Sequence, residues 1–149
     1  MQLHLEGTNT MNAPREKVYA LLTDPNFIAK NLPDSEEVHV LDERSLEGKM
    51  KLKVAVVSTT LKMKMTLLRL SPPEKASISA EGTGSGSTLK VNSIFELSGS
   101  STTSMTWSAD AEIGGVMAGL GAPLLKGFAT KKVAEIFAGI TGAIERSAS

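Results

Sequence analysis

The chain has 149 residues but no cysteine, only two histidines and few aromatic side chains, which make up 4% of the sequence. Without cysteine it has no disulfide, no thiolate nucleophile and no zinc site built on sulfur. Lysine plus arginine and aspartate plus glutamate both number 16, so the net charge is zero. A neutral chain with no basic tract gives no indication of nucleic-acid binding.

Long apolar stretches are also missing. No run of about eighteen apolar residues is present, so we expect no membrane-spanning helix. The first residues carry no basic stretch followed by an apolar run, so we expect no signal peptide. These absences favour a cytoplasmic protein, with a peripheral position at the inner face of the membrane as an alternative.

The pattern that is present predicts an α+β fold. Alternating apolar and polar residues predict a short strand around Leu3 and Leu5, and a helix follows Asn12, which we expect to cap it. A second short helical turn around Phe27 ends by Pro33. Alternation then returns, which is typical of half-buried antiparallel strands. The expected strands cover residues 38–40, 46–56, 61–67, 76–80, 89–97 and 105–113.

A long helix is expected from Val116 to about Arg146, where the apolar period becomes helical. Its stripe is not straight, so either the helix bends near Gly127 or its halves contact different neighbours. Pro123 is unfavourable inside a helix and would mark the point where a loose first segment ends. This order predicts one domain over residues 1–149, with a curved sheet around a single helix.

Chemical groups in a catalytic or metal-binding arrangement are not recognisable. His4 and His39 lack partners at ligand spacing, and we expect both at the surface or a rim. Asp110 and Glu112 fall on the strand face opposite Trp107, which places them in solvent. The glycines of residues 82–86 are followed by a strand, whereas a phosphate-binding loop needs a helix there. We therefore predict no catalytic residue, no metal and no cofactor.

Methionine is the positive signal for binding, because its flexible, polarizable side chain suits adaptable apolar surfaces. A strongly curved sheet is rarely filled by one helix, and apolar cavities bury most of a small ligand's surface. A filled core explains the same pattern and remains the alternative. The residues expected to line a cavity are Met50, Met63, Met65, Phe95, Met105, Trp107, Met117, Leu120, Leu124 and Phe128.

Glycines cluster where the last strand meets the long helix. Gly114 and Gly115 allow a sharp turn of the backbone, which requires nothing beyond geometry. Together with Gly119 and Gly121 they could also form a mobile hinge at the mouth of the cavity.

Lysines crowd the outward face of the hairpin expected between residues 46 and 70. The set comprises Lys49, Lys51, Lys53, Lys62 and Lys64, and Glu37 could offset part of its charge. Like charges across a sheet destabilise it, although charged faces also resist edge-to-edge aggregation. The functional alternative is docking to an anionic partner or to anionic lipid headgroups.

Four segments together resemble one known family. Residues 18–25 read V-Y-A-L-L-T-D-P, 72–75 read P-P-E-K, 82–86 read G-T-G-S-G, and 109–121 read A-D-A-E-I-G-G-V-M-A-G-L-G. In this order the chain resembles the CoxG-like family of carbon monoxide dehydrogenase subunits, which is part of the START-like (SRPBCC) helix-grip superfamily. The most specific part is Gly-Gly-x-x-Ala-x-Leu-Gly at residues 114–121.

The resemblance implies a seven-stranded antiparallel sheet wrapped around the C-terminal helix, with two short helices after the first strand. It also implies a non-catalytic accessory of a carbon monoxide dehydrogenase-type molybdenum hydroxylase, holding a quinone or another lipid in an apolar cavity. One alternative is an assembly module with a filled core that docks through the lysine face. Another is a cavity enzyme of the cyclase type, for which Tyr19 would be the polar group.

Overall fold

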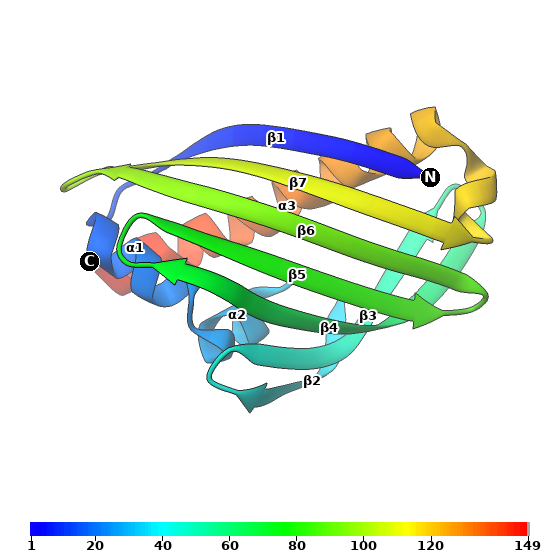
Figure 1. Ribbon diagram of the computed structural model, residues 1–149, viewed down its shortest axis with the longest axis horizontal. Coiled ribbons are helices and arrows are strands. Elements are labelled where there is room, and N and C mark those ends of the chain that lie inside the picture. Colours follow the sequence, from blue (N-terminus) through cyan, green and yellow to red (C-terminus); the bar gives the residue numbers. More distant parts are fainter. Residues whose placement is uncertain (149) are drawn as a thin grey trace.

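The computed structural model describes residues 1–148, and within them seven strands form one curved antiparallel sheet in the order β1-β7-β6-β5-β4-β3-β2 (Figure 1). Two short helices follow the first strand, and a long helix lies on one face of the sheet, as predicted. The elements are β1 (Gln2–Met11), α1 (Arg15–Leu22), α2 (Pro25–Asn31), β2 (Ser35–Asp42), β3 (Ser45–Val54), β4 (Val57–Ser71), β5 (Lys75–Gly84), β6 (Ser87–Gly99), β7 (Thr103–Gly115), a 3-10 helix η1 (Met117–Leu120) and α3 (Ala122–Ala148).

The first and last strands of the chain are neighbours. β1 is an edge strand that pairs with β7, so that Leu5 lies opposite Ala109 and Gly7 opposite Trp107. Successive side chains of a strand point to opposite faces, which places these four residues on the face that α3 covers. At the far edge, β2 leaves β3 with its outer side unpaired. The helix therefore crosses a sheet whose open edge, β1, is formed by the N-terminal residues.

Two local predictions were wrong. Val56 was expected to point inward in a strand, but β3 ends at Val54 and Val56 is 94% exposed in the tight turn to β4, next to Ala55 with φ of 55°. Asn12 was expected to cap the first helix, yet Pro14 occupies the N-cap. The backbone N–H of Asn12 instead donates to Glu145 Oε2 at 2.8 Å, which joins this loop to the end of α3.

α2 begins as its sequence indicates. Asp24 is its N-cap and accepts a hydrogen bond from the N–H of Asn26 at 2.9 Å, while Pro25 occupies the first turn. The missing N–H of proline costs nothing there, because a first-turn amide has no partner within the helix.

The predicted C-terminal helix is divided in two. η1 ends at Gly121, which has φ of 89°, and α3 starts at the next residue, so Pro123 falls in its first turn. The two halves of α3 have different neighbours: Leu125 packs in one apolar cluster, whereas Ile140 and Ile144 pack in another. The rotated apolar stripe has its explanation in these different contacts.

Buried apolar side chains of the described residues form two clusters, one at each end of the sheet. Met11, Tyr19 and Phe95 belong to the cluster beside α1 and α2, and Leu61 and Met117 to the cluster beside η1. Between them lies a strip of inward-facing apolar residues that are only half-buried and, among the residues described, belong to neither cluster. This central strip consists of Leu5, Ala80, Val91 and Ala109.

Candidate functional site: a groove between β1 and α3

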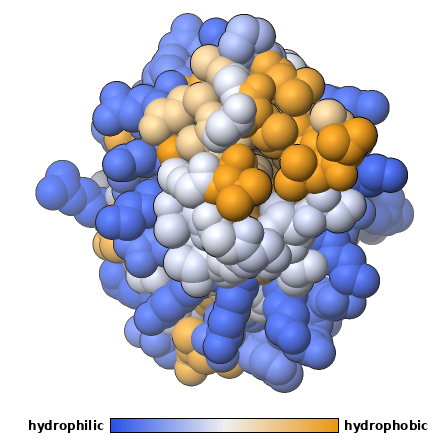
Figure 2. Space-filling model, turned by 90° about the vertical axis from the view of Figure 1, so that its right-hand side faces the viewer, coloured by the Kyte–Doolittle hydropathy of each residue, from blue (hydrophilic) through white to orange (hydrophobic). Residues whose placement is uncertain are grey.

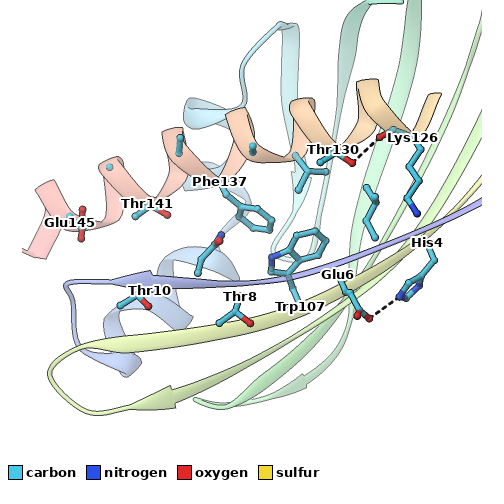
Figure 3. Close-up of a pocket in the computed structure, with 16 residues that line it drawn as sticks. His4, Glu6, Thr8, Thr10, Trp107, Lys126, Thr130, Phe137, Thr141 and Glu145 are labelled. Atoms are coloured by element: carbon cyan, nitrogen blue, oxygen red, sulfur yellow. Dashed lines mark hydrogen bonds and ion pairs between the residues drawn. The ribbon is translucent and has the colours of Figure 1, made fainter. Parts of the chain in front are cut away.

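A groove of about 980 Å³ runs between the edge strand β1 and the helix α3 (Figure 3). Leu5 of the central strip forms part of its wall, so the groove leads from the open edge toward the middle of the sheet. Its lining residues are His4, Leu5, Glu6, Thr8, Asn9, Thr10, Trp107, Lys126, Thr130, Val133, Ala134, Phe137, Ala138, Thr141, Gly142 and Glu145.

The helix side of the groove follows from helical periodicity. Thr130, Ala134, Phe137 and Thr141 recur at intervals of three or four residues, so they share one face of α3. Small and weakly polar residues dominate this face, and Phe137 is its largest side chain. The opposite side of α3 carries the isoleucines that pack in the core, which explains why this face is left open.

An aromatic pair spans the groove. Trp107 of β7 and Phe137 of α3 point toward one another, with ring centroids 5.0 Å apart and planes tilted by 42° (Figure 3). The indole also lies across β1, because a Cβ on Gly7 would sit 2.9 Å from Trp107 Cζ2. Gly7 therefore makes the space that lets Trp107 extend over the edge strand.

Charged side chains lie at the rim. His4 Nδ1 is 2.7 Å from Asp110 Oδ1, and His4 Nε2 is 3.1 Å from Glu6 Oε2. The hydrogen bonds to Asp110 and then Glu6 raise the pKa of His4 above its ordinary value. This trio is exposed, as expected for His4, Asp110 and likewise for Glu112 and His39. The sequence did not indicate that three of these residues meet.

A smaller recess of about 460 Å³ lies on the other side of α3, between Phe128 and the β3–β4 hairpin. Lys132 closes it: its ammonium group binds Asp34 of the α2–β2 loop and Glu135 Oε2, the latter at 3.0 Å, and lies 5.8 Å from the centre of the Phe128 ring. The bond to Asp34 raises the pKa of Lys132, followed in size by the opposing effect of burial. This ion pair ties the helix to the loop.

The residues expected to line a cavity are distributed over three places. Trp107 lines the groove and Phe128 the smaller recess. Phe95, Met105 and Met117 are buried in the two packed clusters, with Leu120 beside the second. Met50, Met63 and Met65 are half-buried on the inner face of β3 and β4 and pack at the edges of these clusters.

Leu124 does not point inward as predicted. It is 43% exposed, while the next residue, Leu125, is 1% exposed and occupies the core. The start of α3 at Ala122 sets this rotation, which the expected helix start at Val116 misplaced. Leu124 and Val116, which is 56% exposed, lie at the end of the molecule where apolar side chains gather at the surface (Figure 2).

The glycine segment is held rather than free. The Val116 N–H donates to Gly86 O at 3.0 Å, and the buried Met117 N–H donates to Ser87 Oγ at 3.1 Å. Gly115 and Gly121 both have positive φ, whereas Gly114 continues β7 and Gly119 lies in open space. Geometry alone therefore requires glycine at 115 and favours it at 121.

The lysine face exists but its charge is partly neutralised. Lys49 lies opposite Lys62 in the β3–β4 ladder, and β2 supplies Glu37, 2.8 Å from Lys49, together with Glu36, 3.4 Å from Lys51. Lys49 accordingly lowers the pKa of Glu37. Lys53, Lys62 and Lys64 are exposed on the same side, and the structure gives them no ion pair within residues 1–148.

Tyr19, the polar group considered for a cavity enzyme, is not in the groove. It is 5% exposed, donates to the Lys75 carbonyl at 3.0 Å and packs edge-on against Phe95. Burial raises its pKa, which keeps the hydroxyl protonated. Across residues 1–148, no three side chains of the metal-ligating types gather into a site.

Sequence reasoning missed most of the groove wall, including Asn9, Val133 and Phe137. The helical spacing of Thr130, Phe137 and Thr141 was a usable signal for a second, weakly polar face. Their position opposite β1 required the pairing of the first strand with the last, which no local pattern predicts.

Comparison with known proteins identifies the family. The model of the CoxG family, whose description is that of a carbon monoxide dehydrogenase component, matches residues 7–145. The chain belongs to this family. Among curated proteins, no sequence matches it.

Solved structures share the CoxG chain's fold at low identity. A conserved protein from Geobacillus kaustophilus has a TM-score of 0.88 and 21% identity, covering 99% of this chain and 98% of that one. A START superfamily protein from Mycobacterium smegmatis has a TM-score of 0.71 and 14% identity, covering 96% and 97%. The Zhui aromatase/cyclase from Streptomyces sp. R1128 has a TM-score of 0.69 and 16% identity, covering 98% and 95%.

These likenesses establish the START-like fold and do not extend to chemistry. Within the part of this CoxG chain that the structure describes, no helix has the length and apolarity needed to cross a bilayer.

Proposed function

We propose that this protein binds a hydrophobic small molecule or lipid in the groove between β1 and α3 and carries out no reaction on it. The observation that carries this proposal is the divided core. Leu5, Val91 and Ala109 face the helix but stay half-buried between two packed clusters. Apolar surface left in this position is stabilised when a guest removes it from water.

The size and lining of the groove fit such a guest. A volume of about 980 Å³ is in the range that holds small molecules. Leu5, Val133, Phe137 and Trp107 supply apolar walls, while threonines along both sides tolerate water near the opening. The methionines Met50, Met63 and Met65 border the central strip and would adapt to the inner end of a long guest.

Family membership supports the biological setting. The CoxG family takes its description from carbon monoxide dehydrogenase, so we propose that the carrier serves a molybdenum hydroxylase of that type. A quinone is a suitable guest, because it is apolar and would link such an enzyme to the membrane. The groove residues would hold this compound without any cofactor of their own.

Ligand binding is tested by native mass spectrometry of the purified protein and by thermal shift with added quinones and fatty acids. A bound apolar compound, or a rise in Tm that grows with ligand concentration, is expected. Ala134→Phe places a large side chain in the groove from an exposed position, so it should abolish the Tm rise while leaving the fold intact.

The matched control is Ala20→Phe, an equal enlargement on the exposed side of α1, which should leave the Tm rise unchanged. If the protein never carries an apolar compound and no quinone or fatty acid raises its Tm, the carrier function is wrong.

A second candidate function is docking at the β3–β4 hairpin. Lys53, Lys62 and Lys64 are exposed, and the hairpin tip presents Val56, which is 94% exposed. An apolar tip beside lysines suits an anionic membrane surface, where each lysine contributes about 1 kcal/mol. A partner protein with an acidic face would meet the same features.

Co-sedimentation with vesicles containing phosphatidylserine tests this docking. Lys53→Glu combined with Lys64→Glu should abolish binding, whereas Lys17→Glu with Lys131→Glu, on exposed helix positions, should weaken it far less. Equal losses from both pairs would indicate attraction by overall charge instead of a specific face. Pull-down of the hydroxylase with the same variants separates a protein partner from the membrane.

A further inference from the structure

We infer that the groove selects guests that carry a neutral hydrogen-bond-accepting oxygen, such as a carbonyl, and that Asn9 and Trp107 provide the donors. This inference rests on the proposed ligand-binding function and specifies the chemistry of the guest. It is carried by two buried nitrogen atoms in the groove wall that have no partner within residues 1–148: Asn9 Nδ2 and Trp107 Nε1.

The two donors lie together. Gly7 pairs with Trp107, and Asn9 is the next inward-facing residue along β1, so Asn9 and Trp107 are diagonal neighbours on one face. The indole extends over Gly7, where a Cβ would be 3.1 Å from Trp107 Nε1. The ring nitrogen thus lies above β1, on the strand that carries Asn9. Both residues line the groove.

Unpaired buried donors are costly, because each loses its hydrogen bond to water without gaining another. Two such donors side by side in a core position would be expected to be replaced or paired within the protein. Beside a groove that leads to solvent, a guest can instead supply the missing acceptor. One oxygen atom accepts two hydrogen bonds, so a single carbonyl matches both donors.

Access to the donors involves the aromatic pair. Phe137 packs on Trp107 from the helix side, and both nitrogen atoms lie just beneath the groove surface. A flat guest that enters between the two rings turns the half-buried Phe137 aside and brings its oxygen to the donors. Stacking with Trp107 on one side and Phe137 on the other then replaces the contact between the rings.

The charge pattern favours a neutral acceptor over a carboxylate. The charged groove residues His4, Glu6, Lys126 and Glu145 lie toward its two ends and are exposed or partly exposed, away from Asn9 and Trp107. Two neutral N–H groups do not compensate the desolvation of a buried anion, whereas they suffice for a carbonyl. Lys126 is available for an anionic group only at the opening.

Two probes of the same shape test the inference: 2-acetylnaphthalene, which carries a carbonyl, and 2-ethylnaphthalene, which does not. Their Kd values are measured by isothermal titration calorimetry on the full chain. Trp107→Phe keeps an aromatic ring but removes one donor, and Asn9→Leu removes the other. Each variant should weaken binding of the acetyl probe about 3- to 10-fold relative to the ethyl probe.

Asn92→Leu is the matched control, because Asn92 is exposed on the outer face of β6 and should leave both Kd values unchanged. Circular dichroism melts confirm that each variant is folded. If both probes lose affinity equally in the variants, or the acetyl probe is unaffected, carbonyl recognition is wrong while ligand binding stands. If neither probe binds the unchanged protein, the proposed function fails and this inference with it.

Discussion

At the scale of single residues, Gly115 has the least freedom to change. Its φ is 75°, and a Cβ placed on it would lie 1.9 Å from the Gly86 carbonyl oxygen, which is backbone and cannot move aside. Gly119, four residues later, has no atom within 4 Å of such a Cβ. The two glycines belong to one motif of the sequence but have opposite steric requirements.

Gly115→Ala should therefore lower the free energy of unfolding by about 2 kcal/mol or more, from left-handed strain and the clash together. Gly119→Ala should change it by less than about 0.5 kcal/mol. Urea unfolding followed by circular dichroism measures both. A similar cost at the two positions would mean that the segment relaxes, as a mobile hinge would.

The His4 trio predicts a pH dependence. Asp110 and Glu6 raise the pKa of His4, so the folded state binds this proton more tightly than the unfolded chain does. The resulting stability is fully present below the unfolded pKa of about 6.5 and is lost as pH rises through the folded pKa. A titration followed by NMR should give His4 a pKa above 6.5.

Asp110→Asn should bring the pKa of His4 down, because the hydrogen bond to Asp110 is its largest cause. Glu112→Gln, two residues along the same outward face of β7, is the control and should leave it in place. No difference between these variants would show that the trio does not persist in solution.

At the scale of elements, the ion pair from Lys132 to Asp34 holds α3 against the α2–β2 loop. The Lys132 side chain is 16% exposed and Asp34 is 47% exposed, so solvent screens the pair in part. The same loop is fixed on its other side, where the Lys51 N–H donates to the Asp34 carbonyl at 3.0 Å. The loop thus connects the long helix with β3.

Lys132→Met keeps the apolar stem over Phe128 and removes the charge. We expect a loss of about 0.5–1 kcal/mol and faster hydrogen exchange at Lys51, while Lys131→Met at the exposed neighbouring position should have neither effect. Exchange at Lys51 that stays as slow as in the unchanged protein would contradict the tie.

At the scale of the whole molecule, the two apolar clusters share the same strands. β4, β6 and β7 each run from one cluster to the other, and α3 contacts both. Neither cluster keeps its strands paired if the other unfolds. We therefore predict that residues 1–149 behave as one domain with a single unfolding transition.

Differential scanning calorimetry checks this prediction, because the calorimetric and van't Hoff enthalpies agree for a two-state transition. Two separable transitions would mean that the ends of the sheet are independent. Ligand binding in the groove between the clusters should raise the midpoint without dividing the transition.

Periodicity in the sequence was sufficient for the elements. Alternation in the segments that became β3, β4 and β7 assigned them to strands and distinguished inward from outward residues, since side-chain direction along a strand depends only on position. Pro123 correctly marked a break before the regular helix. Val56 and Leu124 were misplaced because a turn and a helix start depend on one or two backbone angles that apolar patterns do not encode.

The groove was decided by tertiary structure. Leu5, Asn9 and Trp107 come together only because β1 pairs with β7, which lies about a hundred residues away in the chain. The sequence by itself determined which faces are apolar, because that follows from local spacing. Whether those faces meet or leave a space depends on how α3 crosses the sheet, and that is set by packing at both of its ends at once.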